Sequence, residues 1–153
     1  FESATHSAGV LAMSNSPTVN EEHLASIRSY GHHFGMAYQL VDDLLDYVGD
    51  KAIMGKNTGD DLSEGKLTLP IILALAKTNG KERDTLLYAL KQKSSAHIEE
   101  IVGIITKSGA IEDTRKAALH EIGQAREHLL NLPENEYRYA LESLTDYSAN
   151  RIF

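Results

Sequence analysis

The chain has 153 residues, of which 42% are hydrophobic and 24% charged, and its formal net charge is −7. These values are typical of a globular protein with one packed core. The basic residues are scattered among a larger number of acidic ones, which argues against a nucleic-acid-binding surface. The lack of cysteine excludes a disulfide framework, and the apolar runs are too short to span a membrane. We therefore expect an acidic, cytoplasmic domain that attracts cations.

Apolar residues recur at helical spacing along most of the chain, and few stretches alternate as a strand would. The pattern predicts helices over approximately these ranges: 1–13, 21–48, 68–76, 82–92, 95–107, 111–132 and 134–150. Prolines and glycine-containing polar stretches separate these segments. The predicted fold class is therefore all-α, a bundle of roughly seven helices.

The first two predicted helices carry features that constrain their packing. The first has a set of small and apolar residues on one side: Ala4, Ala8, Leu11 and Ala12. The second contains Gly31 and Gly35, and each glycine costs ~1 kcal/mol relative to alanine inside a helix. Glycines at these positions indicate a close neighbour or a ligand.

Acidic residues interrupt the apolar pattern near the end of the second helix. Asp42 and Asp46 are one helical turn apart and share a face, and Gln39 lies one turn before Asp42. Two carboxylates ~5 Å apart repel by ~3 kcal/mol at an effective dielectric of about 20, and Asp43 adds a further charge. Mg²⁺ would offset this repulsion, because it is usually held by one or two carboxylates with substrate phosphates and waters. The alternative is that these aspartates cap the helix or lie in water.

The stretch 49–66 follows this helix and has the composition of a loop, rich in Gly, Lys and Asp. It contains two Gly-Lys pairs, ending in Lys56 and Lys66, and an acidic pair that starts at Asp60. Lysine ammonium groups bind phosphate, and Asp60 could reach a metal ion through water. Each lysine taken alone is more often a solvated surface charge. Together these residues predict a phosphate-binding loop that folds back over the carboxylates.

The combined motifs resemble the second aspartate-rich region of the trans-isoprenyl diphosphate synthases, with long-chain, octaprenyl-type members the most similar. The resemblance runs from Gly31 to Pro70 and rests on the following elements: Tyr38-Gln39, Asp42-Asp43-x-x-Asp46, Gly55-Lys56, Gly59-Asp60-Asp61-Leu62 and Glu64-Gly65-Lys66-x-Thr68-Leu69-Pro70. It implies that residues 1–153 are the C-terminal part of a larger isoprenoid-synthase-type bundle. The family's first aspartate-rich motif and its arginine pair are not in this sequence, so we expect that residue 1 is not the natural start.

The resemblance implies how a metal would be held. Asp42 and Asp46 would bind Mg²⁺ that bridges the diphosphate of an allylic substrate. Asp43 would support these two residues, and Asp60 would be an outer partner of the metal.

The resemblance also implies the substrate contacts and the reaction. Lys56 and Lys66 would contact the same diphosphate, and Gln39 would line the cavity near the reacting allylic carbon. The implied enzyme is a Mg²⁺-dependent prenyltransferase that condenses isopentenyl diphosphate with an allylic diphosphate in head-to-tail elongation.

We expect the chain to be inactive alone, because the opposing aspartates and arginines are missing, and to associate as a homodimer or heteromer. One alternative is a non-catalytic partner or regulatory half-domain of a heteromeric synthase. Another is an unrelated Mg²⁺-dependent diphosphate hydrolase.

Two further groups of residues are assigned structural roles. His32 and His33 are adjacent and point in different directions on a helix, so we expect surface positions or tertiary contacts. Tyr137, Tyr139 and Tyr147 recur at helical spacing and are expected in the core or at an interface.

Overall fold

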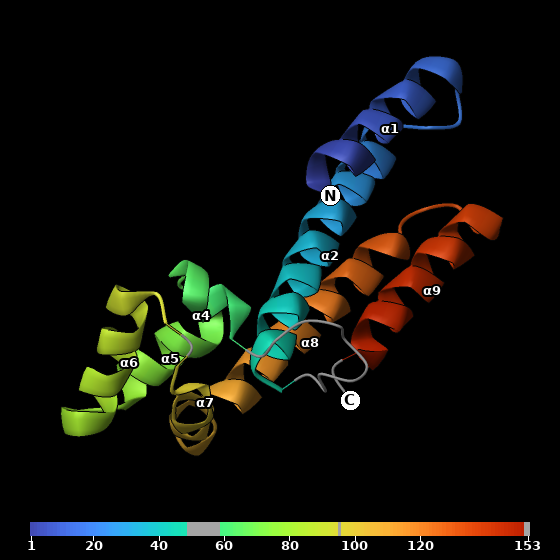
Figure 1. Cartoon of the computed structure of the whole chain (residues 1–153). Helices are drawn as coiled ribbons and strands as arrows, with labels where there is room; N and C mark the ends of the chain where they lie inside the picture. The colour runs from blue at the N-terminus through green and yellow to red at the C-terminus, as the bar shows by residue number, and fades with distance from the viewer. Residues whose placement is uncertain (49–58, 95, 152–153) are drawn as a thin grey trace. The chain divides into compact units, whose positions relative to one another are not determined.

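The computed structural model describes residues 1–48, 59–94 and 96–151. All regular secondary structure in these ranges is helical, which confirms the all-α prediction (Figure 1). The helices are α1 (Glu2–Asn15), α2 (Glu21–Val48), α4 (Asp60–Glu64), α5 (Leu69–Lys77), α6 (Gly80–Gln92), α7 (Ile98–Lys107), α8 (Ala110–Leu129) and α9 (Glu136–Asn150). No helix in the described ranges combines the length and the apolar character needed to cross a membrane.

Most predicted helix boundaries agree with the structure to within a few residues. The long helix α2 has the predicted range, whereas α4 lies inside the stretch predicted as a loop. Helix α9 begins later than predicted because Asn135 caps it. The Asn135 side chain accepts a hydrogen bond from the backbone N–H of Arg138 at 2.9 Å, which satisfies a donor that the helix start leaves unpaired.

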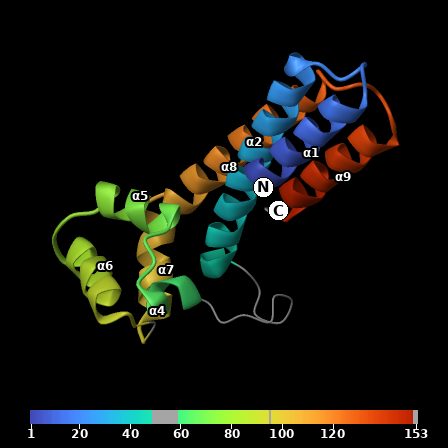
Figure 2. The same cartoon turned by 90° about the horizontal axis from the view of Figure 1, so that it is seen from above.

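The chain divides into two compact units, one formed by residues 1–39 and 117–153 and the other by residues 40–116. In the first unit, α1 and α9 lie alongside α2 and α8 (Figure 2). In the second unit, α5 packs against α6 and α7, and α6 also packs against α4 and α7.

Aromatic and aliphatic residues from α2 and α8 form the core of the first unit. Tyr30 and Phe34 of α2 pack with Ala125 and Leu129 of α8, and all of these side chains are buried. The two aromatic rings are stacked, with centroids 5.7 Å apart. The Tyr30 hydroxyl lies 3.4 Å from Thr145 Oγ1 and so connects α2 to α9. Apolar residues of α2 and α8 therefore form a common core within the first unit.

Glycines allow α1 to approach α2 closely. A Cβ atom at Gly31 would lie 1.9 Å from Thr5 Oγ1, and one at Gly35 would lie 3.0 Å from Phe1 Cβ. The close neighbour predicted from these glycines is therefore α1 together with Phe1, the residue that precedes it. The apolar side of α1 identified from the sequence does not make this contact, because all of its residues are exposed: Ala4, Ala8, Leu11 and Ala12.

The variant Gly31→Ala is expected to destabilise the first unit, because the new methyl group would overlap Thr5. Overpacking costs about 1–3 kcal/mol, and an approach of 1.9 Å to Thr5 Oγ1 favours the upper part of this range, which exceeds the ~1 kcal/mol that alanine adds through helix propensity. Gly123→Ala in α8 is the control, since a Cβ placed there would have no close neighbour within 4 Å apart from the adjacent residues and backbone of its own helix. In urea unfolding, Gly31→Ala should have a lower free energy of unfolding than the wild type and Gly123→Ala a higher one. Equal free energies of unfolding for the two variants would contradict the close approach of α1 to α2.

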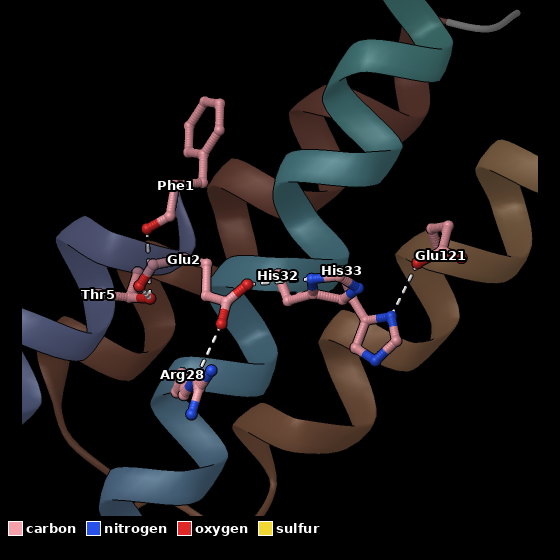
Figure 3. A network of polar contacts seen from close by, with 7 residues as sticks. All are labelled: Phe1, Glu2, Thr5, Arg28, His32, His33 and Glu121. Atoms are coloured by element: carbon pink, nitrogen blue, oxygen red, sulfur yellow. Dashed lines mark hydrogen bonds and ion pairs between the residues drawn. The ribbon is translucent and has the colours of Figure 1, made fainter.

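Ion pairs and hydrogen bonds also connect the helices of the first unit (Figure 3). The Glu2 carboxylate accepts a hydrogen bond from Arg28 Nε at 2.8 Å and lies 3.2 Å from His32 Nδ1, which joins α1 to α2. His33 Nδ1 lies 2.7 Å from Glu121 Oε2 and joins α2 to α8. The surface and tertiary-contact roles predicted for the two histidines are confirmed.

Candidate functional site

The predicted carboxylates lie on the last turns of α2, within the second unit. Asp43 is buried, and Asp42 and Asp46 are partly buried. Gln39, earlier in the same helix, is exposed. Lys56 lies outside the described residues.

The start of α4 lies directly against Asp46. Gly59 precedes α4 with a left-handed φ of 86°, a conformation that favours glycine, and its N–H donates to the Asp46 carbonyl at 3.0 Å. The next two backbone N–H groups, those of Asp60 and Asp61, donate to the Asp46 carboxylate at 3.1 and 3.3 Å. The fold-back predicted from the sequence is therefore present in residues 59–66.

This environment changes the acidity of Asp46. Burial, followed in importance by the Asp61 carboxylate, raises the pKa of Asp46 from 3.8 to about 6, although the hydrogen bonds from the Asp61 and Asp60 backbone oppose the change. The ionised form is therefore disfavoured unless a cation compensates for it. A cation near Asp46 would relieve this cost.

The metal-free chain is expected to lose stability as the pH rises from 3.8 to about 6, because folding takes up a proton on Asp46 in this window. The stabilisation is fully present below the ordinary pKa and is lost as the pH passes the raised one. The group is only half-buried, so solvent screening limits the effect to about 1 kcal/mol. Chemical unfolding of the wild type and of Asp46→Asn across this pH range measures the effect. The free energy of unfolding should depend less on pH in the variant, and an equal pH dependence would contradict the assignment of the raised pKa to Asp46.

Lys66 lies beside the same carboxylates. Its Nζ is 3.1 Å from Asp43 Oδ1 and 3.2 Å from Asp61 Oδ2. Partial burial lowers the pKa of Lys66, but the hydrogen bonds to Asp43 and Asp61 outweigh this and raise the pKa above its ordinary value. The ammonium group therefore stays charged at neutral pH. The structure thus brings a cationic group together with Asp43, while α4 contacts Asp46.

Two features of this region were not predicted from the sequence. Asp61, rather than its neighbour Asp60, contacts the lysine, although the acidic pair itself was recognised. The Tyr47 hydroxyl lies 3.2 Å from Thr68 Oγ1, and both residues are buried. Burial raises the pKa of Tyr47 to about 12, so the phenol stays neutral. No signal in the sequence indicated this pair.

Thr68 lies at the start of α5, but its side chain does not cap that helix. It occupies the N-cap position of α5, and Pro70 follows in the first turn, but the Thr68 side chain makes no capping hydrogen bond. It contacts Tyr47 instead. The contact joins the last turn of α2 to the start of α5.

The donor set suits Mg²⁺ shared with a phosphate ligand. Within the described ranges, no group of three or more His, Asp or Glu residues could hold a metal ion through protein ligands alone. Mg²⁺ usually keeps several waters and binds through one or two carboxylates together with substrate phosphates. Asp42 and Asp46, one turn apart on α2, supply carboxylates of this kind.

Comparisons with known proteins give matches along the whole chain. A Polyprenyl synthetase family model matches residues 1–105. The all-trans-nonaprenyl-diphosphate synthase (geranyl-diphosphate specific) of Rhodobacter capsulatus is 40% identical over 99% of this chain and 45% of its own length. The crystal structure of a decaprenyl diphosphate synthase from Rhodobacter capsulatus has a TM-score of 0.87 at 37% identity, covering 100% of this chain and 46% of that chain.

A second solved structure is a polyprenyl synthase from Caulobacter crescentus CB15 complexed with calcium and isoprenyl diphosphate. It has a TM-score of 0.78 at 36% identity and covers 88% of this chain and 42% of that chain. The chain spans about half the length of the curated relatives it matches. The region matched by the family model includes α2, α4 and Lys66. On this evidence the chain belongs to the polyprenyl synthetase family of prenyltransferases.

Proposed function

We propose that this chain is the C-terminal part of a trans-polyprenyl diphosphate synthase and carries its second aspartate-rich site. The site would bind Mg²⁺ and the diphosphate of an allylic substrate during condensation with isopentenyl diphosphate. The observation that carries the proposal is the placement of Lys66 beside Asp43 and of α4 against Asp46. Two findings support it. The chain belongs to the polyprenyl synthetase family, and it spans about half the length of the curated relatives it matches.

In this proposal, Asp42 and Asp46 hold Mg²⁺, with Asp60 as an outer partner. When bound, the metal neutralises the diphosphate and makes it a better leaving group. Lys66 binds oxygens of the same diphosphate, as does Lys56 from outside the described residues, because a lysine ammonium group forms charge-assisted hydrogen bonds with phosphate. These residues position and neutralise the leaving group.

The reacting end of the substrate needs protection from water. The allylic carbon becomes cationic when its bond to the diphosphate breaks, and an apolar cavity prevents its capture by water. We propose that Gln39 lines this cavity near the reacting carbon and that the released pyrophosphate accepts the proton lost after condensation. The first aspartate-rich motif and the arginine pair would lie in the other part of the synthase.

The test is a chimeric synthase in which this chain replaces the matching 45% of the Rhodobacter capsulatus nonaprenyl diphosphate synthase. We expect Mg²⁺-dependent elongation by the chimera and none by the isolated chain. A chimera that folds, as judged by circular dichroism, but does not condense the substrates would contradict the proposed function. Robust elongation by the isolated chain would contradict the requirement for the other part.

We also propose that the chain associates with itself or with a partner. Tyr137, Tyr139 and Tyr147 are 73%, 52% and 66% exposed, so their predicted core position is wrong and an interface position stays a prediction. Tyr137 lines a hollow of about 440 Å³ in the first unit, together with these apolar residues among others: Ala8, Leu24, Ile27, Leu132 and Leu141. An apolar surface of this kind is typical of an interface.

Sedimentation is expected to show a homodimer or heteromer, because association would remove the apolar side chains from water. Tyr137→Glu and Tyr147→Glu should shift the protein towards monomer. A wild-type monomer that binds no hydrophobic dye would contradict this expectation and show that the fold needs no partner.

A further inference from the structure

We propose that Asp61 is a positioning residue for diphosphate binding, which holds Lys66 in place while its backbone holds Asp46. This inference rests on the proposed function of the site. The resemblance assigns a metal-related role to Asp60 and none to Asp61. The contacts in the structure distinguish the two neighbours.

The Asp61 side chain makes the first contact. Its Oδ2 lies 3.2 Å from Lys66 Nζ, on which Asp43 Oδ1 also converges at 3.1 Å. The Asp43 and Asp61 side chains are only 9% and 19% exposed, whereas that of Lys66 is 41% exposed. The lysine head group is thus held between two carboxylates that are themselves largely fixed by burial.

The Asp61 backbone makes two more contacts. Its N–H donates to Asp46 Oδ2 at 3.3 Å, and its carbonyl accepts a hydrogen bond from the Lys66 N–H at 2.9 Å. Gly65 makes the turn between them possible, since its φ of 76° is left-handed. One residue therefore contacts both a proposed metal-binding carboxylate and a proposed diphosphate-binding lysine, through different atoms.

This arrangement leaves the lysine able to bind an anion. An ammonium group has three N–H donors, so bonds to Asp43 and Asp61 leave one for a diphosphate oxygen. Without the Asp61 carboxylate, Asp43 alone would attract the ammonium group. The flexible lysine side chain would then lose entropy when it binds the ligand, because nothing on the α4 side would hold it beforehand.

Simple electrostatics predicts the opposite outcome, which makes the inference testable. Removing a negative charge near an anion site should strengthen anion binding. If Asp61 positions Lys66, its neutralisation should weaken binding instead. Asn is the appropriate replacement because it has nearly the same shape as Asp and keeps the backbone contacts.

The experiment is calorimetric titration of the full chain with inorganic pyrophosphate at saturating Mg²⁺. We expect Asp61→Asn to weaken pyrophosphate binding by about tenfold, in line with the loss of the charge-assisted hydrogen bond from Lys66 to a phosphate oxygen. Glu64→Gln removes the same charge from the same short helix at an exposed position and should leave the affinity unchanged. In a Lys66→Ala background, Asp61→Asn should have no further effect, because Asp61 acts through the lysine.

Asp61→Asn that binds as the wild type does, or more tightly, would overturn the inference. So would an equal loss in the Lys66→Ala background, since this would indicate a role independent of the lysine. Both outcomes require a wild-type chain that binds pyrophosphate and leave the proposed function standing. A wild-type chain that binds none would overturn the proposed function, and this inference with it.

Discussion

Replacement of Asp42 and Asp46 by alanine in the chimeric synthase is expected to lower turnover by several orders of magnitude. The two residues are proposed to hold the metal that neutralises the leaving diphosphate, so their loss removes an interaction that strengthens in the transition state. Helix content should not change, because alanine favours a helix at both positions. Steady-state condensation and circular dichroism measure the two effects.

Asp113→Ala provides the control for this double variant. Asp113 is a carboxylate of the same unit that forms an ion pair with Lys77 on its surface, away from the proposed site residues in the sequence. Its loss should leave turnover within a fewfold of the wild type. Near-normal condensation by the Asp42→Ala, Asp46→Ala variant would remove the basis for the metal site.

Lys66→Ala in the same chimera is expected to weaken binding of the allylic diphosphate by about tenfold or more, since the ammonium group forms charge-assisted hydrogen bonds with phosphate oxygens. Binding of isopentenyl diphosphate should change much less, because Lys66 is proposed to contact only the metal-bound diphosphate. Separate titrations of the two substrates measure this difference. Lys107→Ala, which removes an exposed lysine paired with Glu82, should affect neither substrate. Equal losses for both substrates would contradict the assigned contact.

Helical periodicity was sufficient to predict the long elements because it repeats over many turns. Helix α2 has the predicted range, and the glycines inside it indicated a close neighbour, which is α1. The same periodicity could not show what covers an apolar side. The stripe on α1 that includes Leu11 is exposed in the described structure, since Gly9 and Thr5 lie against α2 instead.

The short helix α4 could not be predicted in this way. Its sequence, Asp60–Glu64, is too short for a periodic pattern. Its first N–H groups are satisfied by the carboxylate of Asp46, which is distant in the sequence. A helix of this length depends on such tertiary contacts more than on propensity.

The candidate site was predictable in composition but not in detail. The spacing of Asp42 and Asp46 placed them one turn apart because helix geometry fixes that relation. Which residue of the pair Asp60 and Asp61 contacts Lys66 depends on how α4 is oriented, and adjacent residues on a helix point about 100° apart. Sequence alone therefore identifies the pair but not the contact.

Pyrophosphate binding by the chain itself tests the central claim most directly. Isothermal titration calorimetry should detect weak binding that requires Mg²⁺ and disappears in the Asp42→Ala, Asp46→Ala variant. The binding should be weak because the chain supplies only part of the charge partners, and each charge-assisted contact contributes only about 1.5–3 kcal/mol. No pyrophosphate binding at any Mg²⁺ concentration, or binding that the double variant retains, would contradict a diphosphate site built on these carboxylates.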